Sequence, residues 1–194
     1  MDRLEALHTR GFVHRDLKPE NFVIGIGDNA KTIHIIDFGL AERFSDIVTG
    51  MHRPYSEGHE MLGTARYSST NTHNGIAQTR RDDLISLSYI LLYFIRGSLP
   101  WQDLTVSNRE PKYQQMANAK AKLTPYRLCQ GLPTIFSTFI TYAEQLDFEE
   151  VPNYAHLHSL INQHFVKDGH SVDVKFDWEL HPDERGHRVY VLLL

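Results

Sequence analysis

The stretch GFVHRDLKPENFVIG, residues 11–25, contains the most informative group of charged and polar residues in the chain. Within it, His14-Arg15-Asp16 is followed by Lys18 and Asn21. An aspartate such as Asp16 can orient and deprotonate an attacking hydroxyl group. Lys18 can neutralise negative charge on a transferred phosphoryl group, and this electrostatic effect usually exceeds that of the proton transfer. The stretch therefore predicts phosphoryl-transfer chemistry.

A second motif, Asp37-Phe38-Gly39, follows after two short β-branched runs. Asn21 and Asp37 supply an amide oxygen and a carboxylate, which Mg²⁺ accepts as ligands beside water and phosphate oxygens. The two motifs, in this order, resemble the catalytic loop and the metal-binding loop of protein kinases. The resemblance implies ATP and Mg²⁺ as cofactors, with Asn21 and Asp37 binding them. It also implies Asp16 and Lys18 as the catalytic residues.

Composition is that of an ordinary globular protein, with 41% apolar and 23% charged residues among 194. A net charge of -4 gives no electrostatic footprint for nucleic acid, and no basic run indicates membrane binding. Cys129 is the only cysteine, which excludes an intrachain disulfide and favours the cytoplasm or nucleus. The longest apolar stretch, residues 84–95, is too short to cross a bilayer.

Residue spacing predicts a mainly α fold with a small β-hairpin element. Helical spacing over residues 4–8 ends before Gly11, as the end of a helix does. The runs NFVIG and IHIID, joined by GIGDNA, predict the hairpin, and the chain after Phe38 is expected to be irregular up to about Gly75. Further helices are expected at residues 83–96, 111–122, 134–146 and 153–166.

The helix at 83–96 is apolar on nearly every side, which predicts the buried axis of the domain. Its apolar residues are Leu84, Leu87, Ile90, Leu91, Leu92 and Phe94. We expect Asp83, at its start, to contact the loop that contains His14 and Arg15.

A long segment, LGTARYSSTNTHNGIAQTRRDDLISLSYILLYFIRGSLPWQ at residues 62–102, closely resembles the casein kinase I family of serine/threonine protein kinases. Ser69-Thr70-Asn71 stands where that family has a Ser-Ile-Asn-type sequence, and KYQ, LCQGLP, FEEVPNY and FDW are further family-like markers. The resemblance implies the carboxy-terminal lobe of a protein kinase, in which Asp83 supports the catalytic loop. It covers residues 1–180 and leaves 181–194 as a divergent tail. A serine or threonine acceptor fits Lys18.

Casein kinase I enzymes favour acidic or already phosphorylated protein substrates. The family's anion site matches Arg66 and Lys112 here, with Arg15 as a further candidate. A guanidinium fork and an ammonium group can hold a phosphate through charge-assisted hydrogen bonds. Ser56 and His59 stand where the family commonly has extra basic residues, which predicts a weaker preference for phosphate.

Only ten residues precede Gly11, which leaves no room for the amino-terminal lobe of a kinase. Its glycine-rich loop and the lysine that aligns the phosphates are therefore expected to be absent. Two functions remain open. The chain is either a serine/threonine kinase represented by part of its catalytic domain, or a truncated, inactive product that acts as a protein-interaction module.

Two other site signals are weak. The turn at residues 25–30 imitates a phosphate-binding glycine fingerprint, but it joins two strands instead of opening a helix. The twelve histidines lack the helical spacing, with a catalytic glutamate, of zinc enzymes. We therefore predict no site for a transition metal and no phosphate site in the turn.

Overall fold

A computed structural model describes residues 1–104 and 112–167 of the chain. It divides them into two units, one of Met1–Pro152 and one that begins at Asn153, and each is described by itself. The predicted boundary at residue 180, the 181–194 tail, the FDW marker and the predicted helix start at Pro111 lie outside the described residues.

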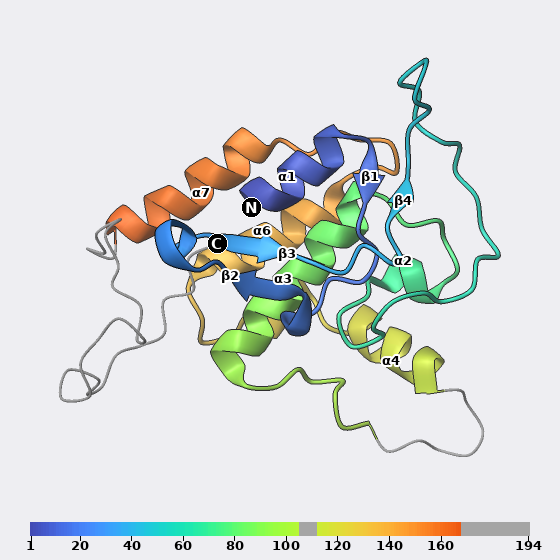
Figure 1. The fold of residues 1–194 in the computed structure, drawn as a ribbon. Coiled ribbons are helices and arrows are strands. Elements are labelled where there is room, and N and C mark those ends of the chain that lie inside the picture. Colours follow the sequence, from blue (N-terminus) through green and yellow to red (C-terminus); the bar gives the residue numbers. More distant parts are fainter. Residues whose placement is uncertain (105–111, 168–194) are drawn as a thin grey trace. The chain divides into compact units, whose positions relative to one another are not determined.

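The first unit is mostly helical, which confirms the predicted class (Figure 1). The helices predicted from residues 4, 83, 111 and 134 are all present, with ends shifted by a few residues, as is usual for helix termini. Two short helices were not predicted, because a single turn contains too few residues to show a period. The helices are α1 (Asp2–Thr9), α2 (Thr70–His73), α3 (Arg80–Arg96), α4 (Lys112–Ala121), α5 (Pro125–Leu128) and α6 (Thr134–Gln145).

The strands form two small antiparallel sheets. β2 (Phe22–Ile24) pairs with β3 (Ile33–Ile35) as the predicted hairpin, with a 3₁₀ turn at Gly27–Asn29 between them. β1 (Phe12–Val13) pairs with β4 (Glu42–Arg43). The prediction of an irregular chain after Phe38 was therefore wrong in part. A strand of two residues whose partner lies 30 positions earlier has no local signal in the sequence.

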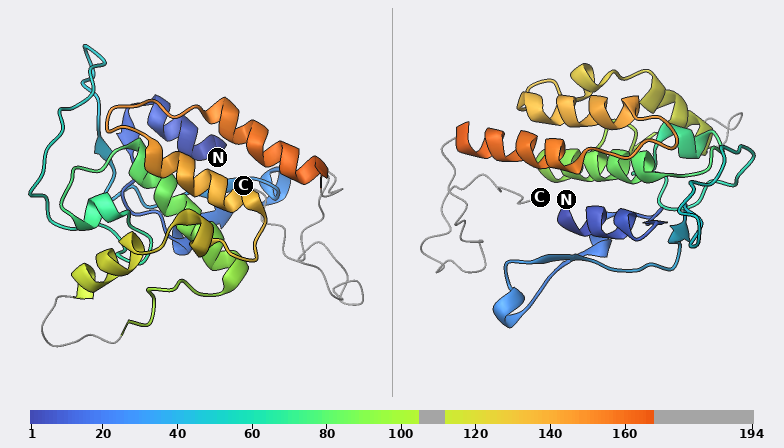
Figure 2. Two further views of the ribbon diagram at one scale, coloured as in Figure 1. Left: turned by 180° about the vertical axis from the view of Figure 1, so that it is seen from behind. Right: turned by 90° about the horizontal axis from the view of Figure 1, so that it is seen from above.

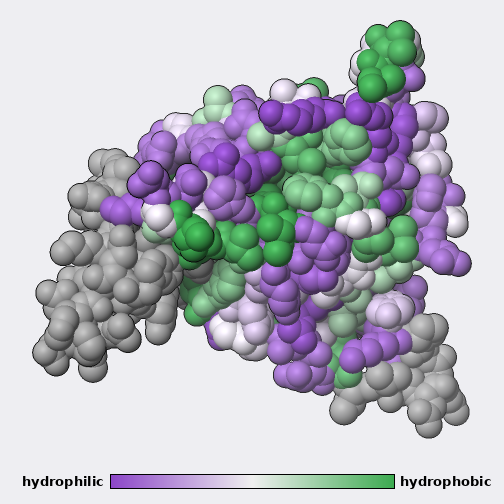
Figure 3. Space-filling model, in the orientation of Figure 1, coloured by the Kyte–Doolittle hydropathy of each residue, from purple (hydrophilic) through white to green (hydrophobic). Residues whose placement is uncertain are grey.

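The segment after β4 makes a narrow projecting loop. Ser45 and His52 form an isolated β-bridge at its base, and the carboxylate of Asp46 accepts hydrogen bonds from the backbone N–H groups of Val48 (2.9 Å) and Thr49 (2.7 Å). The tip is apolar and open to solvent (Figure 3), with Ile47, Val48 and Met51 exposed at 75%, 88% and 70%. The loop thus owes its shape to polar bonds, not to burial of its apolar side chains.

α3 is the buried axis of the first unit and packs along α6 (Figure 2). It begins three residues earlier than predicted, because Thr79 and Asp82 form a capping box in which each side chain bonds the other's backbone. Gly97, in the left-handed conformation, ends it. Most of the predicted apolar residues are buried, but Phe94 is 39% exposed because the last turn emerges from the core.

Leu91→Ala is expected to lower the free energy of unfolding by about 2 to 5 kcal/mol, because the 4%-exposed side chain would leave a cavity. Urea denaturation followed by circular dichroism measures this. Ile95→Ala, at a 42%-exposed position of the same helix, is the matched control and should cost far less. Equal losses in the two variants would contradict the placement of α3.

The second unit contains α7 (Tyr154–Lys167), close to the predicted helix at 153–166. The side-chain oxygen of Asn153 accepts a hydrogen bond from the backbone N–H of His156 (2.9 Å) at its start. Across the described residues, no helix combines the length and the apolar character that spanning a bilayer demands.

Candidate active site

Asp83, at the start of α3, holds the loop that contains His14 and Arg15. One carboxylate oxygen accepts a hydrogen bond from the backbone N–H of His14 (2.7 Å), and the other accepts from that of Arg15 (2.9 Å). The first oxygen also bonds His8 Nε2 at 2.9 Å. Asp83 is 2% exposed. Burial alone would raise the pKa of Asp83, but His8 and the two N–H groups outweigh it and lower the pKa. The contact expected from the sequence is thus present.

Asp16 lies between a cation and a hydroxyl group. One oxygen of its carboxylate accepts a hydrogen bond from Lys18 Nζ (2.7 Å), and the other accepts from Thr64 Oγ1 (2.7 Å). The hydrogen bond to Asp16 raises the pKa of Lys18, so this lysine is a cation at neutral pH. Asp16 is 9% exposed, whereas the side chain of Lys18 is 25% exposed. The carboxylate is thus fixed in orientation, with a positive charge directly beside it.

Gly63 allows the segment with Thr64 to approach this loop. Its φ is +91°, and a Cβ atom at this position would lie 2.2 Å from the carbonyl oxygen of Arg15. No side chain fits at that distance, so only glycine permits the bond between Thr64 and Asp16.

Asn21 and Asp37 stand at the same end of the β2–β3 hairpin. The backbone N–H of Ile36 donates to the carbonyl oxygen of Asn21 (2.9 Å), which places Asp37 next to Asn21 along the ladder. Asn21 Nδ2 donates to the backbone oxygen of Asp16 (2.9 Å), and this bond orients the amide so that Oδ1 remains as an acceptor. Asp37 is exposed and adopts the left-handed conformation, with φ of 63°. An amide oxygen and an open carboxylate from this end of the hairpin are the kinds of ligand that Mg²⁺ accepts together with water and phosphate oxygens.

Apolar side chains continue from this end along the hairpin. Val23, Ile24, Ile36 and Phe38 are between 37% and 52% exposed. Successive strand residues such as Val23 and Ile24 point to opposite faces, so only part of this set can lie on the side of a bound nucleotide, whose base is flat and largely apolar.

Arg15 lies in a second, small pocket, apart from the other two predicted anion-binding residues. Its guanidinium group donates to the carboxylate of Glu42 (2.8 Å) and to the carbonyl oxygen of Leu40 (2.6 Å). Arg53 donates to the same carboxylate and to the carbonyl oxygen of Gln78. Burial would raise the pKa of Glu42, but Arg53 and Arg15 lower it overall. Glu42 therefore joins the catalytic-type loop to the segment after β4.

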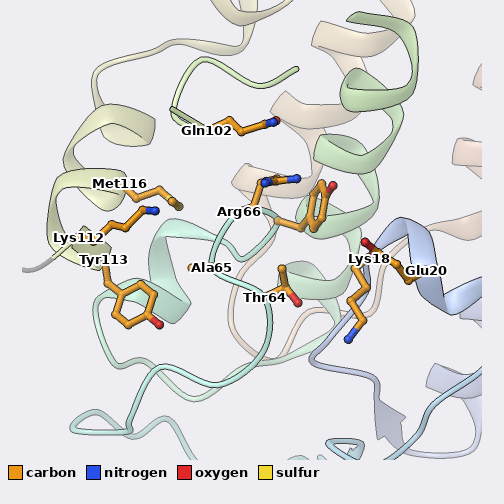
Figure 4. A pocket seen from close by; sticks show the side chains of 10 residues that line it. Lys18, Glu20, Thr64, Ala65, Arg66, Gln102, Lys112, Tyr113 and Met116 are labelled. Carbon is orange, nitrogen blue, oxygen red and sulfur yellow. The ribbon is translucent and has the colours of Figure 1, made fainter. Parts of the chain in front are cut away.

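Arg66 and Lys112 line one pocket of about 860 Å³. Lys18 and Thr64, which contact Asp16, line the same pocket. Figure 4 shows Lys112 extending from α4 with its ammonium end directed towards the segment that carries Arg66. The guanidinium carbon of Arg66 lies 5.9 Å from the centroids of the Tyr67 and Tyr93 rings, so this arginine is supported by aromatic faces.

The segment Ser69-Thr70-Asn71 is tied to the start of α3. Ser69 Oγ donates to a carboxylate oxygen of Asp82 (2.6 Å) and caps α2 by accepting from the N–H of Thr72 (3.0 Å). Asp82 is fully buried, and this burial raises its pKa despite the bonds from Ser69 and Thr79. Ser56 and His59, singled out as departures, are hydrogen-bonded to each other at 2.8 Å.

The carboxylate of Asp16 with its lysine partner next to an open pocket, together with Asn21 and Asp37 at the end of the hairpin, fits a site for transfer of a group between bound partners. The protein-family model described as Protein kinase domain matches residues 1–163. The chain therefore belongs to the protein kinase family. Members of this family transfer phosphoryl groups to proteins and generally use ATP and Mg²⁺.

Several site residues were not identified from the sequence. Thr64 had no signal, because its bond to Asp16 spans 48 positions. Glu42 was not singled out, because its partners Arg15 and Arg53 lie 27 and 11 positions away in the sequence. Asp82 could have been found, since Thr79 and Asp82 have the spacing of a capping box. Lys120 could also have been suspected, because it shares one helix face with the buried Met116 and Ala117.

Proposed function

We propose that the chain is the catalytic-loop and substrate-binding part of a serine/threonine protein kinase of casein kinase I type, as a lobe spanning residues 1–180. One observation carries the proposal. The carboxylate of Asp16, held by Lys18 and Thr64, adjoins a pocket that Lys18 and Thr64 share with Arg66 and Lys112. The two residues that hold the proposed catalytic carboxylate thus line the same cavity as the proposed substrate anion site.

Asp16 orients the acceptor hydroxyl and takes its proton, because its carboxylate is kept in one orientation by two hydrogen bonds. Lys18, a cation at neutral pH, offsets the charge on the phosphoryl oxygens. Asn21 and Asp37 would hold Mg²⁺, and ATP, when bound, would supply the phosphoryl group and leave as ADP. The acceptor is serine or threonine, as the resemblance at Lys18 implies.

Substrates are acidic or already phosphorylated proteins in this proposal, since Arg66 and Lys112 present two positive charges to one pocket. Arg66 is partly buried and lies near two tyrosine rings, which favours its guanidinium group remaining at the pocket before an anion binds. The proposed part of Arg15 in substrate binding requires its release from Glu42. The proposed location is the cytoplasm or the nucleus, because the single cysteine suits a reducing compartment.

In a form that carries both lobes, the double variant Arg66→Ala/Lys112→Ala is expected to lose activity on a peptide with a phosphoserine near the acceptor. Expressed as a free energy, the fall in kcat/KM should be about 1 to 3 kcal/mol larger for the phosphorylated peptide than for the unphosphorylated one, because two charge-assisted contacts disappear. This difference should shrink as salt rises, since exposed charges are screened. Values of kcat/KM for both peptides over a salt series measure it.

The matched control is Lys122→Ala/Arg127→Ala, which removes one lysine and one arginine from exposed positions outside the pocket. This control should leave the ratio of the two peptides unchanged. If the pocket variant lowered activity on both peptides equally, Arg66 and Lys112 would serve the fold instead of recognition.

A further inference from the structure

A buried lysine beside the pocket has no part in the chemistry described so far. Lys120 lies in the last turn of α4 and is 4% exposed. Its Nζ donates hydrogen bonds to the backbone carbonyl oxygens of Ala65 (2.8 Å) and Ser68 (2.5 Å). Burial of a lysine costs free energy, and here it lowers the pKa of Lys120 well below the usual value. The hydrogen bonds of Lys120 therefore hold the segment from Ala65 to Ser68 in place, and the burial of the lysine offsets part of the stability they give.

Neutral groups from three parts of the fold surround the ammonium group. The ring centroids of Tyr89 and Trp101 lie 5.3 and 5.1 Å from Nζ, and aromatic faces attract cations. His73 Nε2, at the end of α2, lies 3.1 Å away. Burial, followed by the charge of Lys120, lowers the pKa of His73 to about 4. The imidazole therefore stays neutral at physiological pH and does not repel the lysine.

The carbonyl groups that Lys120 binds flank Arg66. Trp101 Nε1 donates to the carbonyl oxygen of Arg66 itself (2.8 Å). The backbone on both sides of Arg66 is thus bonded to Lys120 and Trp101. Its side chain lines the pocket, as Figure 4 shows. The bonds from Lys120 and Trp101 thus hold the backbone from which the Arg66 side chain extends.

Lys120 and Lys112 belong to the same helix, eight positions apart. A helix is rigid over this length, so the bond from Lys120 to the loop also fixes where Lys112 stands relative to Arg66. We propose that Lys120 is a positioning residue that sets the spacing of Arg66 and Lys112, and with it the preference for phosphorylated peptides. The inference rests on the proposed function of that pair.

The test is binding of two serine peptides to the full 194-residue chain, followed by fluorescence anisotropy. One peptide carries a phosphoserine and the other is its unphosphorylated twin. Lys120→Met keeps the length and removes the donors, and should weaken binding of the phosphopeptide about ten-fold, as loss of one charge-assisted contact would. The twin should change much less. Lys122→Met, at an exposed position just after α4, should change neither affinity.

Three outcomes separate the possibilities. If Arg66→Ala/Lys112→Ala leaves binding of the phosphopeptide unchanged, the proposed substrate class fails, and this inference fails with it. The other case is that the double variant Arg66→Ala/Lys112→Ala weakens binding of the phosphopeptide more than that of its twin. If Lys120→Met then weakens binding of both peptides equally, or of neither, only the role of Lys120 is overturned. Where Lys120→Met does not fold by circular dichroism, Lys120→Gln, which keeps two N–H donors, replaces it. An equal loss on both peptides there overturns the role as well.

Discussion

Asp16→Asn is expected to abolish peptide phosphorylation in a form of this kinase that has an amino-terminal lobe joined to residue 1. The asparagine keeps the size of the side chain but cannot take a proton, and it weakens the bond from Lys18. General base catalysis contributes about 100- to 10,000-fold, so the rate should fall by at least that range. Single-turnover phosphorylation of a serine peptide measures the loss directly.

Two controls make this result specific. Asp28→Asn makes the same chemical change at an exposed turn position and should leave the rate intact. If residues 1–194 are one lobe only, as proposed, they should by themselves give only background transfer, because positioning of ATP supplies most of the catalysis. Activity of the 194-residue chain that Asp16→Asn abolishes would refute that expectation. Silence even with the added lobe would favour the interaction-module alternative.

Asp83→Ala is expected to be the most destabilising single change in the first unit. It removes the acceptor of the N–H groups of His14 and Arg15 and of the His8 ring, all brought together at one buried carboxylate. Breaking a buried, charge-assisted network costs about 3 to 5 kcal/mol. Urea unfolding measures the loss. Asp147→Ala, at an exposed position, is the control. A loss no larger than that of the control would contradict the anchoring of the loop by Asp83.

The same residue predicts sensitivity to acid. The pKa of Asp83 is lowered in the folded chain from a usual value of 3.8. The carboxylate therefore stabilises the fold fully above about pH 3.8, and this stabilisation is lost as pH falls through the lowered pKa. The difference in stability between the native chain and Asp83→Ala should narrow over that acidic range. A difference that stayed constant with pH would mean that the charge of Asp83 contributes nothing.

Local patterns in the sequence predicted the long elements of the fold well. α3 was evident because apolar residues fill almost every position from Leu84 onward, and the β2–β3 hairpin because its strands are adjacent in the chain. The β1–β4 pair and α2 were missed, since one depends on a partner far along the chain and the other is four residues long. Phe94 was placed in the core because periodicity does not show where a helix leaves it.

In the candidate site, too, the residues of local motifs were predicted and their distant partners were not. Motif spacing predicted four site residues that lie on one continuous loop and hairpin, namely Asp16, Lys18, Asn21 and Asp37. The partner that fixes the orientation of Asp16, Thr64, lies at a distant position of the sequence. It reaches Asp16 because Gly63 allows the two backbone segments to approach closely. Long-range hydrogen bonds of this kind have no local spacing in a sequence. The roles of all these residues in catalysis stay predictions until the variants are measured.

The bridge made by Glu42 has a consequence for competition between anions. Its carboxylate belongs to the same chain as Arg15 and Arg53, so its effective concentration at the two guanidinium groups is on the order of millimolar or higher. A soluble phosphate at Arg15 must displace this tethered competitor. Glu42→Lys would replace the competing carboxylate with a third cation. The small pocket that contains Arg15 should then bind anions more tightly than it does with Glu42.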